Sequence, residues 1–181
     1  TYNGDGLYKS TNAGVSWVKI SGGFGSRTHF NDIAISPFNS KVIIATLGSG
    51  FWHLGNVAEE GVYRSTDGGV SFTRVMNFGD PFDVKFHPTD SNKVFVTLGG
   101  ATANSGLYTS TNMGSTFSKS STGAPTTTMG RAHIAIAQSN PAIMYMLNYD
   151  GDTKAFKSTN TGSTWVQISP NQPLGGTYDG T

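Results

Sequence analysis

Three residues at matching places in the chain carry side chains that can exchange protons. Asp32, Asp83 and His133 each stand at the start of a short β-rich run. Carboxylates that converge in one place shift one another's pKa, so such a set could supply an acid and a base. An aspartate at the start of a strand is also an ordinary turn residue. Both interpretations stay open: a catalytic set at the centre of the fold, or three turn residues.

A second group of residues could hold a ligand. The segment GSGFWHLGNVAEEG (48–61) combines two aromatic residues, a histidine and two glutamates. Exposed aromatic rings beside carboxylates suit stacking on sugar rings and hydrogen bonding to hydroxyls. In the alternative interpretation, the two aromatic residues fold back over their own sheet or meet another domain. The candidate ligand-binding residues, here and at corresponding places, are Arg27, His29, Phe51, Trp52, His53, Glu59, Arg131, Tyr149 and Asp150.

An octapeptide that occurs four times sets the spacing of these residues. Its copies are STNAGVSW (10–17), STDGGVSF (65–72), STNMGSTF (110–117) and STNTGSTW (158–165), separated by 55, 45 and 48 residues. Two β-rich runs joined by a polar turn precede each of the last three copies. A further β-rich run enters every copy and another leaves it. Four strands in a unit of about 40–50 residues are typical of a propeller blade.

The fold class that we predict is an all-β β-propeller of four-stranded antiparallel blades. The chain divides into a half blade (1–20), blades at about 29–76, 82–120 and 131–169, and a connection at 170–181. Ile33–Ile35 and Val42–Leu47 are apolar with little alternation, which predicts inner strands buried on both faces. Because propellers need about four to eight blades to close, we expect an incomplete segment, with the remaining blades in the same larger polypeptide.

The octapeptide chemistry favours a structural turn. Ser and Asx side chains bond nearby backbone N–H groups, the glycine suits a positive φ, and the last aromatic residue can pack between sheets. The rival interpretation is a repeated carboxylate site for calcium or for acid–base chemistry, but only Asp67 is acidic at the third position. The predicted structural residues are Ser10, Asn12, Gly14, Trp17, Ser65, Asp67, Gly69, Phe72, Ser110, Asn112, Gly114, Phe117, Ser158, Asn160, Gly162 and Trp165.

These octapeptides resemble the Asp-box, or bacterial neuraminidase repeat, Ser/Thr-x-Asp-x-Gly-x-x-Trp/Phe. That repeat occurs in sialidases, xyloglucan-cleaving endoglucanases, sortilin-type receptors and secreted propeller proteins of Bacteroidetes-type bacteria. The resemblance implies that each box joins strands three and four, on the rim away from any active site. For a sialidase it also implies an arginine triad, whereas this chain holds only Arg27, Arg64, Arg74 and Arg131, two of them flanking a box.

The amino-acid composition argues against several classes of function. The net charge is +1 and only 13% of the residues are charged, so the sequence lacks the excess of basic residues that is typical of nucleic-acid-binding proteins. No apolar run approaches the roughly 18 residues of a membrane span, so we predict no membrane insertion. There is no cysteine, the four histidines lack metal-ligand spacing, and we predict no metal and no cofactor.

Together these observations favour a bacterial module, secreted or at the cell surface, that binds a glycan or a protein on its loop-rich rim. The alternative is a fragment of a glycoside hydrolase, resembling a xyloglucanase more than a sialidase. Its catalytic carboxylates would be shared with blades outside this chain.

Overall fold

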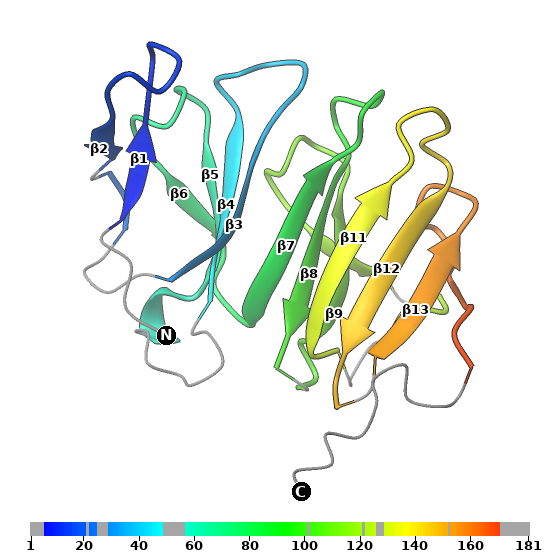
Figure 1. Cartoon of the computed structure of the whole chain (residues 1–181). Coiled ribbons are helices and arrows are strands. Elements are labelled where there is room, and N and C mark those ends of the chain that lie inside the picture. The colour runs from blue at the N-terminus through cyan, green and yellow to red at the C-terminus, as the bar shows by residue number, and fades with distance from the viewer. Residues whose placement is uncertain are drawn as a thin grey trace, which may run out of the picture.

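The computed structural model describes residues 6–20, 22–24, 29–48, 57–100, 102–120, 122–125, 129–151 and 153–170. These residues form one two-stranded and three four-stranded antiparallel sheets (Figure 1). The elements are β1 (Leu7–Lys9), β2 (Val18–Ile20), β3 (Phe30–Ile35), β4 (Ile43–Leu47), η1 (Val57–Glu59), β5 (Gly61–Ser65), β6 (Thr73–Met76), β7 (Asp80–Phe86), β8 (Val94–Gly99), β9 (Gly106–Ser110), β10 (Ser118–Ser120), β11 (Arg131–Ile136), β12 (Met144–Tyr149), β13 (Thr153–Ser158) and β14 (Val166–Gln167). The single helical element of the described residues is η1, a short 3-10 turn.

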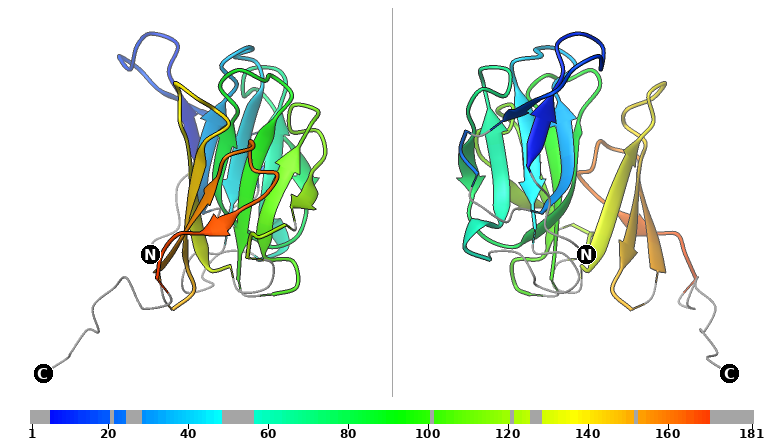
Figure 2. Two further views of the ribbon diagram at one scale, coloured as in Figure 1. Left: turned by 90° about the vertical axis from the view of Figure 1, so that its right-hand side faces the viewer. Right: turned by 60° about the vertical axis from the view of Figure 1, so that its left-hand side comes forward.

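The sheets follow one topology, with strands side by side in chain order. They are β3-β4-β5-β6, β7-β8-β9-β10 and β11-β12-β13-β14, while the two-stranded sheet is β1-β2. The first strands of successive sheets lie next to one another, β3 beside β7 and β7 beside β11. The sheets therefore stack face to face with a shared inner edge, as Figure 2 shows from two sides. The predicted fold class is confirmed: the chain is an incomplete segment of a β-propeller.

The apolar runs become inner strands, but not all are buried on both faces. Every residue of β4 and of β8 is buried, as expected for strands between two neighbouring sheets. The prediction for Ile33–Ile35 is wrong, because Ile33 is 42% and Ile35 is 58% exposed. These side chains point toward the two-stranded sheet, which has no inner strands to cover them.

Each octapeptide closes its turn with the same hydrogen bonds. In the second copy, the Ser65 hydroxyl donates to Asp67 Oδ1 at 2.8 Å and accepts the Gly69 N–H at 2.9 Å. The Ser71 hydroxyl donates to Asp67 Oδ2 at 2.6 Å, and this bond is the first cause that holds the pKa of Asp67 well below its ordinary value. In the other copies an asparagine amide donates instead to the hydroxyl, at 2.8 Å. Asp and Asn therefore close the same turn, because the hydroxyl can either donate or accept.

The octapeptides also join neighbouring sheets. The Gly68 and Met113 N–H groups donate to carbonyls in the turn between the first two strands of their own sheet, at 2.9 and 2.8 Å. The carbonyls of the same two residues accept from the preceding sheet, from Lys9 Nζ at 2.6 Å and Arg64 Nε at 2.9 Å. These turns and the octapeptides share one rim, the octapeptide rim (top in Figure 1). We call the opposite end of the strands the far rim.

The last aromatic residue of the octapeptide packs inside the fold in three of the copies but not in the first. Phe117 is half-buried against the apolar cluster between the first and second four-stranded sheets. Phe72 and Trp165 are 7% and 4% exposed, whereas Trp17 is 61% exposed. The expectation that Trp17 packs between sheets is therefore wrong. Its sheet has only two strands, so the ring has too few neighbours to cover it.

The octapeptide glycines should be sensitive to added volume. At Gly114, φ is +77° and an added Cβ would lie 2.6 Å from Ile44 Cδ1 of the preceding sheet. Gly151 also has a positive φ, +106°, but no atom lies within 4 Å of its added Cβ. We expect Gly114→Ala to lower the free energy of unfolding by about 1–3 kcal/mol more than Gly151→Ala, measured by urea denaturation. Equal losses would show that the packing against Ile44 contributes nothing.

Candidate functional site

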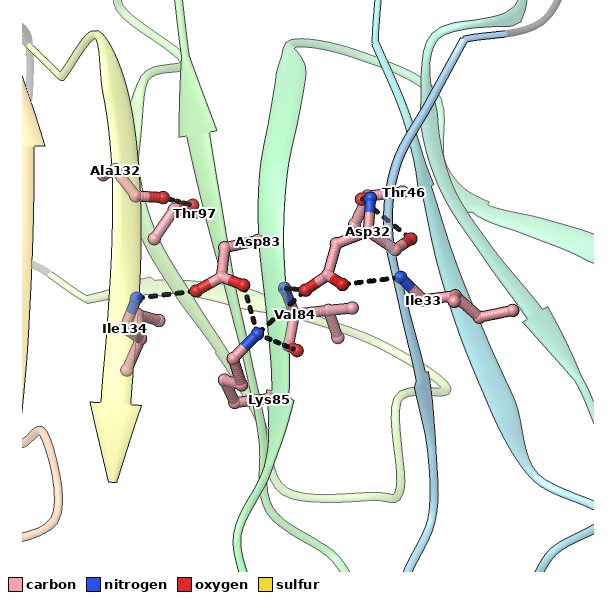
Figure 3. A network of polar contacts seen from close by, with 9 residues as sticks. All are labelled: Asp32, Ile33, Thr46, Asp83, Val84, Lys85, Thr97, Ala132 and Ile134. Carbon is pink, nitrogen blue, oxygen red and sulfur yellow. Dashed lines mark hydrogen bonds and ion pairs between the residues drawn. The ribbon is translucent and has the colours of Figure 1, made fainter. Parts of the chain in front are cut away.

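The inner strands bring two of the three proton-exchanging residues together. Asp32 on β3 and Asp83 on β7 both contact the ammonium group of Lys85, which lies between them (Figure 3). Lys85 Nζ is 2.9 Å from Asp32 Oδ2 and also donates to Asp83 Oδ1. Lys85 follows Asp83 by two residues, so both side chains lie on the same face of β7. We call Asp32, Asp83 and Lys85 the inner-strand triad.

Each aspartate of the triad also accepts a backbone N–H from the next sheet. Asp32 Oδ2 accepts the Val84 N–H at 3.1 Å, and Asp83 Oδ2 accepts the Ile134 N–H at 2.6 Å. The two bonds are equivalent, because both donors lie one position beyond the matching residue of the next sheet. Each carboxylate therefore links its own blade to the following blade by a hydrogen bond.

The surroundings push the pKa values of the two aspartates in opposite directions. Burial, the largest cause, raises the pKa of Asp83, and the adjacent Asp32 raises it further. Burial also acts to raise the pKa of Asp32, but the contacts with Asp83, the Lys85 ammonium and the Val84 N–H outweigh it, so that this pKa lies below its ordinary value. Burial acts to lower the pKa of Lys85, yet its hydrogen bonds to the two carboxylates raise it. Asp83 is thus the carboxyl group of the triad that protonates first as the pH falls.

A pair with divided pKa values could exchange protons, but its geometry leaves no room for a sugar. Glycosidases hold their two carboxyl groups about 5–9 Å apart, on either side of the scissile bond. Here both carboxylates contact one nitrogen atom, and the Asp83 side chain is only 3% exposed. The hydrogen bonds of the triad make it a connection between blades.

The third member of the predicted set does not join the triad. His133 lies on β11 opposite Leu147, on the exposed face of its sheet. Its position matches that of Asp32 opposite Thr46 and of Asp83 opposite Thr97. The neighbouring Ala132 carbonyl and Ile134 N–H are both bound from the second sheet, by Thr97 at 2.7 Å and by Asp83. The strand is therefore fixed while the His133 side chain stays at the surface.

Several predicted ligand-binding residues gather at the far rim of the third sheet. Arg131 and Tyr149 are cross-strand partners on β11 and β12, and both are exposed, Tyr149 by 51%. The Arg131 guanidinium carbon lies 5.7 Å from the centre of the Phe82 ring. Asp150 follows directly and pairs with Lys154 at 3.4 Å. We call Arg131, Tyr149, Asp150 and Lys154 the third-sheet rim.

The other predicted ligand-binding residues lie apart from that cluster. His29 is half-buried, and its carbonyl accepts the Gly48 N–H at 3.0 Å. Glu59 is half-buried in η1, where its carbonyl accepts the Tyr63 hydroxyl at 2.9 Å. Arg74 donates to the carbonyls on either side of Glu59, and so holds this short segment in place. The predictions for Arg27, Phe51, Trp52 and His53 fall outside the described residues.

Sequence reasoning missed Lys85, which completes the triad. A signal was present, since Lys85 shares a strand face with Asp83 by simple alternation. Among the residues that the structure describes, no group of three His, Asp or Glu side chains could hold a metal ion. Nor do the described residues include a helix long and apolar enough to cross a membrane.

Comparison with known proteins finds one matching family and a group of glycoside hydrolases. The model of the Sortilin-Vps10 family, described as sortilin, neurotensin receptor 3, matches residues 60–173. A xyloglucanase from Hypocrea jecorina (strain QM6a) is 29% identical over 175 residues, and one from Paenibacillus sp is 25% identical over 169. These alignments cover 92% and 91% of this chain but only 17% and 15% of the two enzymes. The chain thus spans about a sixth of the length of the curated relatives that it matches.

Solved structures support the same fold. The crystal structure of an ancestral GH74 enzyme matches with a TM-score of 0.72 and 24% identity, over 93% of this chain and 22% of that one. The GH74 enzyme from Niastella koreensis matches with a TM-score of 0.68 and 20% identity, over 90% and 26%. The expected resemblance to sialidase-, xyloglucanase- and sortilin-type propellers is confirmed, and the chain is a glycoside hydrolase-like propeller segment.

Removing the Lys85 charge should destabilise the chain in a pH-dependent way. Lys85→Met leaves two carboxylates side by side, and we expect a loss of about 1–2 kcal/mol at pH 7, below the loss for a fully buried pair because Lys85 is partly exposed. Without the ammonium, the pKa of Asp83 rises further above its unfolded value. The variant should therefore recover stability as the pH falls through that raised pKa. Urea denaturation between pH 4 and 8 measures this.

Lys93→Met is the matched control, because Lys93 pairs with Asp90 only at 4.0 Å. We expect a small change in the free energy of unfolding, with no recovery at low pH. If Lys85→Met behaves in the same way, the triad does not connect the blades.

Proposed function

The chain belongs to the Sortilin-Vps10 family, and on that premise we propose that it is a polysaccharide-binding part of a longer extracellular propeller protein. The ligand that we propose is a xyloglucan-type β-glucan, bound along the far rim of the third sheet. The two curated relatives support this ligand class, since both are named xyloglucanases. The near-neutral, weakly charged surface also suits a neutral polysaccharide better than a polyanion.

The observation that carries the proposal is a break in the repeat on the third sheet. In the first two sheets, three matching positions hold Asp, Thr and Gly, and the Asp and Thr residues form hydrogen bonds that fix the inner strands. In the third sheet the same positions hold His133, Leu147 and Tyr149, on the face that meets a following sheet in the other two; no sheet of the described residues covers that face here. The third sheet therefore lacks, at three adjacent positions, the residues that bond and admit a following sheet in the first two sheets, and this difference supports a ligand at this end of the strands.

The chemistry of this surface suits a sugar ligand. A tyrosine ring can stack on the apolar face of a pyranose, and charged groups can bond the hydroxyls around it. Tyr149 lies opposite Arg131 and next to Asp150 in the chain, so both kinds of contact come from one end of the third sheet. Asp150 is held by Lys154, which fixes the carboxylate without consuming all its acceptor sites.

Catalysis is the second candidate function, and the xyloglucanase relatives favour it. In that case a carboxylate of this chain acts with a partner group from a different blade, because Asp32 and Asp83 share one ammonium and cannot flank a glycosidic bond. Their hydrogen bonds give both residues a structural role, so loss of activity alone would not identify a catalytic group. Turnover and stability must therefore be measured separately for each variant.

We expect Tyr149→Ala to weaken binding to xyloglucan about fivefold, which corresponds to about 1 kcal/mol of lost stacking. Tyr145→Ala is the matched control, since Tyr145 is a similarly exposed tyrosine on the same face of β12, but toward the octapeptide rim. Affinity gel electrophoresis with soluble xyloglucan measures both variants. Equal retention of Tyr149→Ala and the unchanged chain would remove the third-sheet rim from the binding surface.

A reducing-end assay on xyloglucan, with the longer natural protein, tests the catalytic alternative. Asp32→Asn and Asp83→Asn should lower Tm while leaving turnover per folded molecule unchanged, because we assign both residues to the interblade connection. Turnover abolished in a variant that remains folded by circular dichroism would contradict this assignment and favour a catalytic carboxylate.

A further inference from the structure

A buried histidine closes the turn between the first two strands of the second four-stranded sheet. His87 directly follows β7 and is only 6% exposed. Its Nδ1 atom accepts the N–H groups of Thr89 at 3.3 Å and of Asp90 at 3.0 Å. Since backbone N–H groups can only donate, Nδ1 carries no proton, and the proton of the neutral ring is on Nε2. Nε2 is buried and faces the Pro141 backbone of the third sheet, without a hydrogen bond of good geometry among the described residues.

The matching turns of the other two four-stranded sheets form without a histidine. Ser36, His87 and Ala137 occupy the same place, because the N–H of each donates to the carbonyl that ends its turn, at 2.9, 3.0 and 3.0 Å. The Ser36 hydroxyl accepts the Phe38 N–H at 3.3 Å. Ala137 has no side-chain acceptor at all. The turn therefore needs no titratable group, and His87 adds a dependence on pH that the other two turns lack.

The surroundings of His87 do not favour a positive charge on the ring. Burial is the largest cause that lowers the pKa of His87, and the Lys93 ammonium lowers it further. The Asp90 carboxylate and the Pro141 carbonyl act in the opposite direction but do not offset these causes. The facing turn of the third sheet, residues 137–142, and the third octapeptide contain no ionisable side chain. A protonated ring would thus lie among hydrogen-bond donors with one partly exposed carboxylate nearby.

A continuous series of hydrogen bonds connects His87 to the preceding sheet. The N–H of Asp90 donates to the ring, and Asp90 Oδ1 accepts the Asn92 N–H at 3.0 Å. The Asn92 carbonyl accepts the N–H of Met113 in the third octapeptide at 2.8 Å. The Met113 carbonyl in turn accepts Arg64 Nε of the first four-stranded sheet at 2.9 Å. A change at His87 can therefore reach the contact between the first and second four-stranded sheets.

We propose that His87 is a pH-sensitive switch, which holds the third octapeptide in place when it is neutral and releases it when it is protonated. A proton on Nδ1 turns this atom into a donor that faces the N–H groups of Thr89 and Asp90. The Thr89 hydroxyl, 3.5 Å away, is too distant to accept well. The turn then opens, the Asn92 carbonyl moves away from the Met113 N–H, and the contact with the preceding sheet loosens.

Mild acid should open this turn and leave the two matching turns closed. Because the pKa of folded His87 lies below the unfolded value of about 6.5, the stability that the neutral ring provides is complete above that value and is lost as the pH falls through the folded pKa. Hydrogen exchange of single N–H groups measures this. The protection factor of Met113 should fall about tenfold from pH 7.5 to pH 5. The equivalent N–H groups of Gly68 and Thr161, bonded at 2.9 and 3.0 Å, should keep theirs.

Two variants and one further signal complete the test. His87→Asn keeps an acceptor near the position of Nδ1 but cannot gain a proton in this range, so the Met113 protection factor should be equal at both pH values. His133→Asn is the matched control, because it removes an exposed histidine on β11, and it should respond to pH like the unchanged chain. The Arg64 Nε–H, followed by NMR, should exchange faster at pH 5 only where His87 is present.

Three outcomes would overturn the proposal. The first is a Met113 protection factor that does not change between the two pH values. The second is an equal loss at Gly68, Thr161 and Met113, which would mean that acid opens the whole chain rather than this turn. The third is a His87→Asn chain that still responds to pH. The first two comparisons use the unchanged chain, so they decide the matter even if His87→Asn does not fold.

Discussion

The need to cover both faces of every inner strand governs this structure. A strand such as β8 is apolar on each side, with Phe95 facing one neighbouring sheet and Val96 the other. A sheet of this kind is stable only between two others, because each uncovered face leaves apolar side chains in water. The three apolar clusters that the described residues form accordingly lie between sheets, and each combines strands from two of them.

The polar connections follow from the same stacking. A sheet that packs by its faces can slide, since apolar contacts have little direction. Hydrogen bonds are directional, and those between the sheets fix the position of one sheet relative to the next at both ends of the strands. Lys9 and Arg64 bind octapeptide carbonyls at one rim, and Asp32 and Asp83 bind inner-strand N–H groups toward the other. The octapeptide is therefore as much a contact between blades as a turn within one.

The sequence alone predicted the strands and their grouping into four-stranded sheets, because these depend on local patterns that recur in the chain. The turn chemistry of Ser65 and Asp67, for example, involves residues a few positions apart. It did not predict the exposure of Ile33 or Trp17, which depends on the neighbouring sheet rather than on the residues themselves. Convergence of Asp32 with Asp83 followed from their matching positions, but the part played by Lys85 required the distance between strands.

Comparing matching positions of the three four-stranded sheets shows where the third sheet differs from the other two. At the far rim, Gly48 and Gly99 occupy a position where an added Cβ would lie within 2.5 Å of a neighbouring segment, so the repeat there demands glycine. In both cases the nearest atom belongs to the segment that begins the following sheet, and no such sheet follows the third among the described residues, where Tyr149 fills the matching position. The replacement of Asp and Thr by His133 and Leu147 lies on the same face. The third sheet thus lacks, at three adjacent positions, the residues by which the first two sheets bond and admit the sheet that follows them.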